Sequence, residues 1–223
     1  MDGAAATTFQ AATGPAPSRI AVLASGSGTN LQALIDANAR GQLGPGRLVV
    51  VGSNVAGCGA LARAAAASLE TFVLAHRGYP TREAFDQALV TALRGHGVEL
   101  VVLAGFMRIL TAELLGAFPG RVVNIHPSLL PAFPGVNSQA QAFHYGVKVT
   151  GCTVHFVELG VDSGPIIAQA AVPVRDDDDA ERLRQRILVE EHALLPAVVR
   201  ALCEGRVAMT GRKVTVRPLP ASS

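Results

Sequence analysis

An amide and an imidazole lie two residues apart near the middle of the chain, in a run that reads VVNIH. Asn124 and His126 occupy positions i and i+2, so on a strand both side chains point to the same side. An amide N–H can stabilise an oxyanion, and an imidazole can bind or release a proton near neutral pH. A histidine at a strand end is more often structural than catalytic, so the pair needs a partner before it indicates chemistry.

A carboxylate that could complete such a site lies 36 residues beyond His126. Asp162 stands in a glycine-rich turn at 158–164, where a carboxylate commonly caps its own turn or is solvated. If the fold brings Asp162 to His126, the carboxylate can hold a protonated imidazole or position a water molecule. His155 precedes that turn in an extended run and is a further candidate, although the alternation of the run does not decide its direction.

A glycine-rich turn near the N-terminus indicates an anion-binding site. The segment 24–30 reads ASGSGTN and links the first expected strand to the first expected helix. Gly28 allows the backbone to approach an anion, and the helix start at Thr29 and Asn30 offers free N–H groups. In an open parallel sheet this turn lies at the carboxyl ends of the strands, where ligands bind. The segment predicts a phosphate-binding turn; a helix-capping turn without a ligand is the alternative.

The same turn lacks the features of larger nucleotide-binding motifs. Leu31 stands where a GxGxxG motif has its third glycine, and the next strand ends in Gly-Ser-Asn at 52–54 without a carboxylate for a ribose hydroxyl. No Gly-Lys-Ser/Thr sequence follows, as a P-loop requires. One phosphate on a small molecule therefore fits better than a dinucleotide, and a nicotinamide-dependent dehydrogenase is a weak alternative.

Short runs of β-branched residues alternate with helical runs in the first half, a pattern that is typical of βαβ units. We expect strands at 19–24, 47–52, 71–74, 100–104 and 122–126. We expect helices at 30–39, 60–67 and 81–93. Because right-handed crossovers place helices on both faces, the prediction is an α/β fold with a Rossmann-like, mostly parallel sheet.

The second half changes character and predicts antiparallel strands added to that sheet. Extended runs at 150–158 and 166–174 flank the glycine-rich turn, and a long helix is expected at 179–202, where Pro196 could introduce a kink. A hairpin is expected within the C-terminal tail, 207–223. Residues 1–18 have no periodicity and are expected to form a disordered extension outside the folded domain, 19–206.

The composition excludes several classes of function. Only 4% of the 223 residues are aromatic, Trp is absent and the formal net charge is +2, so a nucleic-acid platform is not indicated. Although 49% of the residues are hydrophobic, no apolar stretch approaches the roughly 18 residues of a membrane span. Three separate cysteines without a CxxC motif disfavour a disulfide framework and a cysteine zinc site, which fits the cytoplasm. We expect small-molecule partners and no metal; a monomer and a homodimer stay open.

Five segments together resemble one family. ASGSGTNLQALIDA, LVVLAGFMRIL, VVNIHPSLLPAFPG, GVKVTGCTVHFV and GVDSGPIIAQ occur in the order and spacing of the folate-dependent glycinamide ribonucleotide formyltransferases. The resemblance covers the chain from Arg19 to about Arg206. NIHPSLLP followed by Asp162 resembles folate formyl-transfer domains in general, and SGSGTNLQ resembles the branch that uses glycinamide ribonucleotide.

The resemblance implies transfer of a formyl group from 10-formyltetrahydrofolate to the amine of glycinamide ribonucleotide, in purine synthesis. It implies that Asn124, His126 and Asp162 are catalytic. It divides the domain into a phosphate-binding half, 19–118, and a catalytic and folate half, 119–206. The residues implied to bind the ribonucleotide are Gly28, Thr29, Asn30 and Glu191. Those implied to bind the folate are Arg82, Met107, Arg108, Ile109, Leu110 and Asn124.

One segment departs from the family pattern, and two other functions stay open. Many relatives carry a histidine or an acidic residue where this chain has the neutral segment 136–139, so substrate contacts there are in doubt. A formyltetrahydrofolate hydrolase resembles the same core but usually has an added N-terminal domain, which 18 loose residues cannot supply. Methionyl-tRNA formyltransferases have an added C-terminal barrel, which the roughly 20 residues after the last expected helix cannot supply. A non-catalytic nucleotide-binding module is the alternative from another class.

Overall fold

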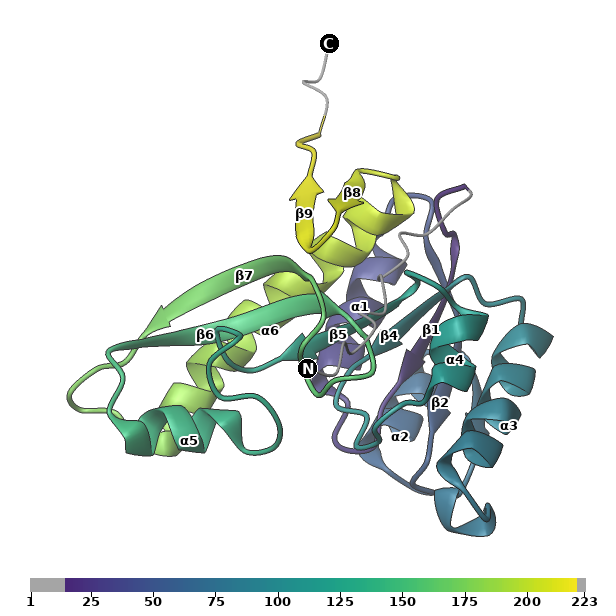
Figure 1. Cartoon of the computed structure of the whole chain (residues 1–223), viewed down its shortest axis with the longest axis horizontal. Helices are drawn as coiled ribbons and strands as arrows, with labels where there is room; N and C mark the ends of the chain where they lie inside the picture. Colours follow the sequence, from purple (N-terminus) through teal and green to yellow (C-terminus); the bar gives the residue numbers. More distant parts are fainter. Residues whose placement is uncertain (1–14, 220–223) are drawn as a thin grey trace, which may run out of the picture.

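A seven-stranded sheet forms the centre of the computed structural model, which describes residues 15–219 (Figure 1). Its strands are β1 (Arg19–Leu23), β2 (Arg47–Ser53), β3 (Glu70–Val73), β4 (Leu100–Leu103), β5 (Val122–His126), β6 (Val149–Phe156) and β7 (Ile166–Pro173). Their spatial order is β3-β2-β1-β4-β5-β6-β7, with the first five parallel and β6 and β7 antiparallel. The predicted mostly parallel sheet with added antiparallel strands is confirmed.

Six α-helices within the described residues cover the sheet. They are α1 (Thr29–Ala39), α2 (Gly59–Ala66), α3 (Arg82–Gly95), α4 (Ala112–Ala117), α5 (Ser138–Tyr145) and α6 (Ala180–Cys203). A short 3₁₀ helix, His76–Gly78, precedes α3. Periodicity does not predict α4 and α5, because segments of 6 and 8 residues contain too few turns to reveal a helical period.

Each face of the sheet has its own apolar core. On one face, buried side chains of α1, α2 and α6, such as Leu34 and Leu195, pack against the strands. On the other face, α3 and α4 contribute Phe85, Leu89 and Leu114. Each such side chain stabilises the fold by about 1.5–3 kcal/mol on burial. Helices on both faces leave only the strand ends open for ligands.

The long helix α6 begins as its acidic sequence predicts. The side chain of Asp179 caps it by accepting a hydrogen bond of 2.7 Å from the backbone N–H of Arg182. The helix continues through Pro196 to Cys203. Its buried stripe includes Glu191, an acidic side chain that is only 5% exposed.

The two ends of the described chain are attached to the sheet domain. Residues 1–14 of the expected extension lie outside the described residues, but Ser18 donates through its N–H and its hydroxyl to Glu99 at 2.7 and 3.0 Å. Strands β8 (Val207–Thr210) and β9 (Lys213–Val216) form an antiparallel hairpin beyond α6. Among the described helices, none combines the length and apolar character needed to cross a bilayer.

Candidate active site

A cleft of about 660 Å³ opens at the carboxyl ends of β1, β4 and β5. This is the edge of an open parallel sheet where ligands bind, and the volume suits a small molecule. The cleft brings together segments from five parts of the chain, which are 25–30, 103–110, 124–127, 135–139 and 155–162. Glu191 of α6 closes one wall. Of the twelve residues expected to bind or catalyse, only Arg82 does not line it.

Asn124, His126 and Asp162 converge on one side of this cleft. Asn124 and His126 lie on β5 and both point to the cleft, as their i and i+2 spacing predicts. Nδ1 of His126 lies 3.2 Å from Oδ2 of Asp162, and Nδ2 of Asn124 lies 3.4 Å from Oδ1 of the same carboxylate. The turn after β6 therefore brings the distant carboxylate within hydrogen-bonding distance of the imidazole.

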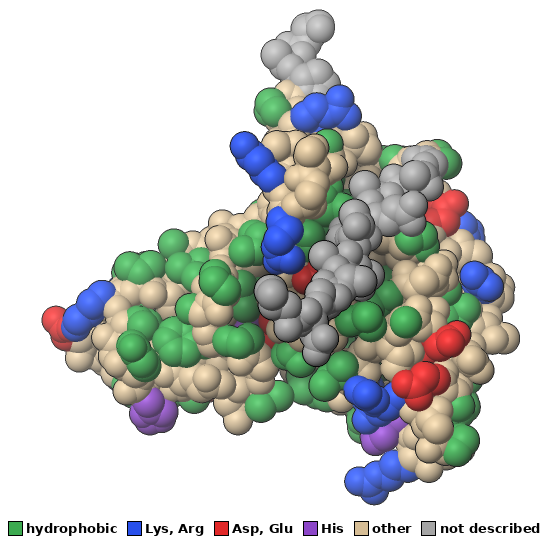
Figure 2. Space-filling view, viewed as in Figure 1, with side chains coloured by type: hydrophobic (Ala, Val, Ile, Leu, Met, Phe, Trp, Pro, Cys, Tyr) green, Lys and Arg blue, Asp and Glu red, His purple; other side chains and the backbone are tan. Residues whose placement is uncertain are grey.

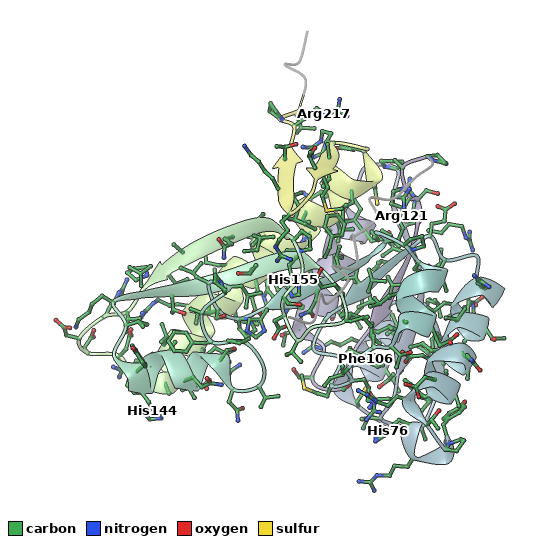
Figure 3. All side chains as sticks on the ribbon, viewed as in Figure 1. His76, Phe106, Arg121, His144, His155 and Arg217 are labelled. Atoms are coloured by element: carbon green, nitrogen blue, oxygen red, sulfur yellow. The ribbon has the colours of Figure 1, made fainter. Side chains whose placement is uncertain are left out.

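His155 joins this group, and the strand register explains why. On β6, His155 pairs directly with Asn124 of β5, so both side chains lie on the same face of the sheet. Its Nε2 is 3.2 Å from Nδ2 of Asn124 and 3.5 Å from Oδ1 of Asp162. Its Nδ1 lies 2.8 Å from the carbonyl oxygen of Phe156. Figure 3 places His155 near the middle of the molecule, whereas His144 lies at the outer end of α5.

Asp162 is held in an unusual backbone conformation. Its φ of 49° lies in the left-handed region, which a non-glycine residue adopts only where the surroundings fix it. Gly164 follows two residues later. A Cβ on Gly164 would lie 1.8 Å from the carbonyl oxygen of Phe156, so no larger residue fits there. The backbone N–H of Gly135 donates to Oδ2 of Asp162 at 2.8 Å. These contacts hold the carboxylate against the two histidines.

The electrostatic environment keeps Asp162 ionised. Burial works to raise the pKa of Asp162, but hydrogen bonds from His155 and the Gly135 N–H, together with the charge of His126, outweigh it. The pKa of this carboxyl is therefore lower than its ordinary value. The Gly135 N–H is a contributor that sequence analysis missed, since a backbone donor leaves no side-chain signal.

Both ring nitrogens of His126 face oxygen atoms. Nδ1 faces Asp162, and Nε2 lies 2.9 Å from the carbonyl oxygen of Phe133. A neutral imidazole carries one N–H and can donate to only one of them, whereas the doubly protonated ring donates to both. The site thus offers an acceptor for each N–H of a doubly protonated ring.

The loop after β5 is fixed by a buried polar network. Oγ1 of Thr153 donates to the Ser128 carbonyl at 2.7 Å and accepts from the Leu130 N–H at 3.1 Å. Nε2 of Gln169 donates to the Leu130 carbonyl at 2.9 Å. Buried polar groups with satisfied partners specify one geometry. Thr153 and Gln169 therefore hold the segment that presents Phe133 to His126.

The glycine-rich turn has the geometry of an anion site. Gly28 has a φ of +73° and caps α1, and a Cβ there would lie 2.6 Å from Cα of Ala60. The turn can approach α2 this closely because position 28 carries no side chain. The first N–H groups of α1, at Thr29 and Asn30, lack helical acceptors and lie at the positive end of the helix dipole.

Glu191 reaches the same end of the cleft from α6. Nδ2 of Asn30 donates to Oε2 of Glu191 at 2.8 Å. Burial raises the pKa of this carboxyl, and the hydrogen bond from Asn30 only partly offsets it. Oδ1 of Asn30 is buried without a hydrogen-bond partner within residues 15–219, so it has acceptor capacity left for a donor in the cleft.

The segment 105–111 forms the opposite wall. Met107 and Ile109 are 64% and 53% exposed and line the cleft, whereas Phe106 and Leu110 are buried in the core of the α3 face. The outer side chains give the wall an apolar surface, which suits a flat aromatic ligand.

Arg82 and residues 136–139 differ in their position relative to the cleft. Arg82 is the first residue of α3 and is exposed outside the lining of the cleft. The neutral segment Val136, Asn137, Ser138 and Gln139 does line it, and Asn137 has a φ of 58° at the start of α5. The side chains at 137 and 139 therefore present amides to the cleft.

No group of three or more His, Cys, Asp or Glu side chains suited to a metal occurs in residues 15–219. The arrangement instead defines a class: an α/β protein with an anion-binding turn and an acid–base cluster at the same strand edge. The Formyl transferase family model matches residues 18–199, and the chain belongs to this family.

Relatives and solved structures agree with that assignment. The chain is 50% identical over 207 residues to a phosphoribosylglycinamide formyltransferase of Mycobacterium tuberculosis, covering 90% of this chain and 95% of the relative. It is 48% identical over 188 residues to the trifunctional purine biosynthetic protein adenosine-3 of Drosophila melanogaster, covering 84% of this chain and 14% of that protein. Glycinamide ribonucleotide transformylase 1 from Symbiobacterium toebii aligns with a TM-score of 0.88 and 50% identity, over 94% of this chain and 99% of that one.

Proposed function

We propose that this protein transfers the formyl group of 10-formyltetrahydrofolate to the primary amine of glycinamide ribonucleotide, a step of purine synthesis. The observation that carries the proposal is the convergence of Asn124, His126 and Asp162 in a cleft that also contains the anion-binding turn. The names of relatives that are 50% identical over most of this chain support the same reaction.

The two ends of the cleft suit the two substrates. The ribonucleotide phosphate would lie at Gly28, Thr29 and Asn30, where the N–H groups of the helix start favour an anion. Glu191 would accept hydrogen bonds from the N–H groups of the glycinamide portion. These contacts orient the amine toward Asn124 and His126 across the cleft. Holding both reactants in this way replaces a bimolecular encounter with an oriented one.

The folate would lie along the wall formed by Met107, Arg108, Ile109 and Leu110. The apolar outer side chains of this wall would cover the pterin, and its backbone groups would hydrogen-bond to the pterin edge. Arg82, exposed beyond the cleft, would meet the charged tail of the folate. The formyl group then projects toward Asn124, where the two substrates meet.

Attack of the neutral amine on the formyl carbon forms a tetrahedral oxyanion. The Nδ2–H of Asn124 would donate to that oxygen without changing its own charge. Removing one such donor typically raises the barrier by about 3–4 kcal/mol. A doubly protonated His126 would stabilise the same oxyanion over a short distance.

The remaining steps move protons. The attacking nitrogen loses a proton and the folate nitrogen gains one before the C–N bond to folate breaks. Asp162 is 12% exposed at its side chain, so a water molecule can reach it, and the carboxylate can relay the proton while it holds Nδ1 of His126. The formyl group is already activated on the folate, so the proposed reaction uses no metal.

The test is to mix the purified protein with glycinamide ribonucleotide and 10-formyltetrahydrofolate and to measure the formylated product and the absorbance of the released folate. We expect product and released folate in equal amounts. Release of folate without formylated product indicates a formyltetrahydrofolate hydrolase instead. Tight calorimetric binding of both substrates without any turnover indicates a non-catalytic binding module.

Two substitutions test the proposed catalytic residues. Asp162→Asn and His126→Ala are each expected to lower kcat by at least about 10²-fold, the usual size of general acid–base contributions. His144→Ala, at the outer end of α5, is the control and should keep the wild-type rate (Figure 3). Near wild-type turnover in either of the first two variants would rule out the mechanism.

A further inference from the structure

The wall formed by residues 105–111 has few hydrogen bonds of its own, although it lies between β4 and the short helix α4. The one backbone bond within it joins the Arg108 N–H to the Phe106 carbonyl at 2.9 Å. A segment without helix or strand pairing depends on side chains from elsewhere for its conformation. Two such side chains, one near each end, take this role.

The first is Ser25, which lies in the turn after β1. Its hydroxyl accepts a hydrogen bond of 2.8 Å from the Met107 N–H and donates one of 2.5 Å to Oδ1 of Asn54. Its own N–H donates to the Gly105 carbonyl at 3.0 Å. Asn54 is buried and lies 3.3 Å from Nδ1 of His76. The wall is thus attached to two parallel strands through one hydroxyl.

The second is Asp86, which lies on α3 and is 1% exposed. Its Oδ2 accepts from the Thr111 N–H at 2.6 Å and from the Thr111 hydroxyl at 2.9 Å. Oγ1 of Thr111 accepts in turn from the Glu113 N–H and caps α4. A buried carboxylate is destabilising unless it is hydrogen-bonded, and within residues 15–219 both hydrogen bonds to this one come from Thr111. This contact fixes the far end of the wall.

Between the two contacts the side chains alternate. Phe106 and Leu110 are buried, and Met107 and Ile109 point to the cleft. The guanidinium of Arg108 lies 5.7 Å above the ring of Phe85, the residue before Asp86 on α3. A small rotation of the segment would therefore exchange buried and exposed side chains and remove the surface that the folate would contact.

We propose that Ser25 and Asp86 are positioning residues for the folate-binding half of the active site, acting through the Met107 N–H and through Thr111. This inference rests on the proposed function. Asp86 does not line the cleft, and Ser25, which does, uses its hydroxyl for the Met107 N–H and for Asn54. Both residues therefore act by holding the wall in the conformation that presents Met107 and Ile109. Preorganisation of this kind lowers the cost of ordering the site when a ligand binds.

Four substitutions distinguish positioning of the wall from a general effect on the stability of the fold. Ser25→Ala removes the first contact, and Thr111→Val removes the hydroxyl bond to Asp86 while keeping the side-chain shape. Thr111→Ser keeps the hydroxyl and should restore the wild-type behaviour. Thr91→Val is the matched control, because the Thr91 hydroxyl makes a single bond of 3.0 Å to the Gln87 carbonyl on the exposed side of α3.

The measurements are steady-state kinetics with each substrate varied, and calorimetric binding of folic acid, which has the pterin but no formyl group. For Ser25→Ala and Thr111→Val we expect the KM for 10-formyltetrahydrofolate and the Kd for folic acid to rise about threefold to tenfold. The KM for glycinamide ribonucleotide and kcat should stay within about twofold. In Ser25→Ala, hydrogen exchange at the Met107 amide should become faster.

Each outcome decides between the two proposals. If the wild type binds folic acid but transfers no formyl group, the proposed function fails and the folic acid Kd of the variants still tests the positioning role. If the wild type neither binds folic acid nor transfers a formyl group, both are overturned. If it is active and the variants leave both substrates unchanged, or affect both equally, the positioning role alone is overturned.

Discussion

Asp162 connects the polar groups around Asn124 and His126 in the candidate active site. Its Oδ2 meets the Gly135 N–H and His126, and its Oδ1 faces Asn124 and His155. Because both oxygens have donors on two sides, the carboxylate sets the orientation of the amide and both rings at once. Removing it disturbs geometry as well as charge, so Asp162→Asn, which keeps the shape, is a better probe than Asp162→Ala.

The charge of a second single residue, Glu191, can be tested by substitution, because burial of this carboxylate destabilises the folded state. Burial raises the pKa of Glu191 above its ordinary value of 4.5, so ionisation destabilises the folded state. Glu191→Gln removes the charge, and the Gln oxygen can still accept from Asn30. We expect the variant to have a higher Tm at pH 7.5, by a few degrees, and a higher KM for glycinamide ribonucleotide.

The Tm difference between Glu191→Gln and the wild type should depend on pH. Below pH 4.5 the carboxyl is neutral in both folded and unfolded chains, so the Tm difference between variant and wild type should vanish there. The difference should grow as pH rises from 4.5 through the raised pKa and stay constant above it. Glu190→Gln removes the same charge from a half-buried neighbour and is the control. A Tm difference that does not change with pH would contradict the assignment.

The sequence predicts some of these residues and not others, for physical reasons. Asn124 and His126 were detectable because side chains two apart on one strand share a face. Asp162 depends on a turn 36 residues away, so only its resemblance to a family motif placed it with His126. His155 could be placed only once the register opposite Asn124 was known, and register depends on the whole strand pair.

At the scale of elements, the turn before α1 makes a sharp prediction about two glycines. Gly28 has a φ of +73°, and a Cβ on it would lie 2.6 Å from Cα of Ala60, whereas no atom lies within 4 Å of a Cβ on Gly26. Gly28→Ala should therefore lower the free energy of unfolding by about 2–5 kcal/mol, through strain and overpacking. Gly26→Ala should change it by less than about 1 kcal/mol.

Urea unfolding of both variants measures this difference. Similar losses in the two variants would mean that the turn does not depend on the close approach to α2. A substitution at Gly28 is therefore a poor test of phosphate binding, since a rise in KM could come from a distorted turn. Thr29→Ala is more suitable, because it leaves the backbone conformation of the turn allowed.

Elements with a clear period were predictable, and short or irregular ones were not. The strands of the parallel sheet and α1, α3 and α6 carry enough residues to reveal an apolar pattern. The helices α4 and α5 form where Thr111 and Asn137 begin a turn after a loop, and tertiary packing rather than periodicity supports them. The family resemblance indicates residues 107–110, but the conformation of the wall at 105–111 could not be predicted, since it depends on hydrogen bonds to Ser25 and Asp86.

At the scale of the whole molecule, the C-terminal hairpin is attached to the turn that carries Asp162. Figure 1 shows β8 and β9 beside the end of α6, and Figure 2 shows basic side chains over this hairpin. At the hairpin turn, Nη1 of Arg212 lies 3.2 Å from Oε1 of Glu158, and its Nη2 donates to the Ser163 carbonyl. Arg212 of the hairpin thus contacts Ser163, the residue that follows Asp162.

This attachment predicts an effect on rate with little effect on stability. Arg212→Gln removes both contacts and should lower kcat about threefold, because Asp162 keeps its bonds to Gly135 and His126 but its turn becomes less restricted. An exposed ion pair contributes only about 0–1 kcal/mol and is screened by salt, so Tm should hardly change. Lys213→Gln removes the same charge from the next residue and should leave kcat unchanged. The rate difference between the Arg212 variant and the wild type should narrow near 1 M salt. A difference independent of salt, or an equal loss in the Lys213 variant, would show that the hairpin does not act through this contact.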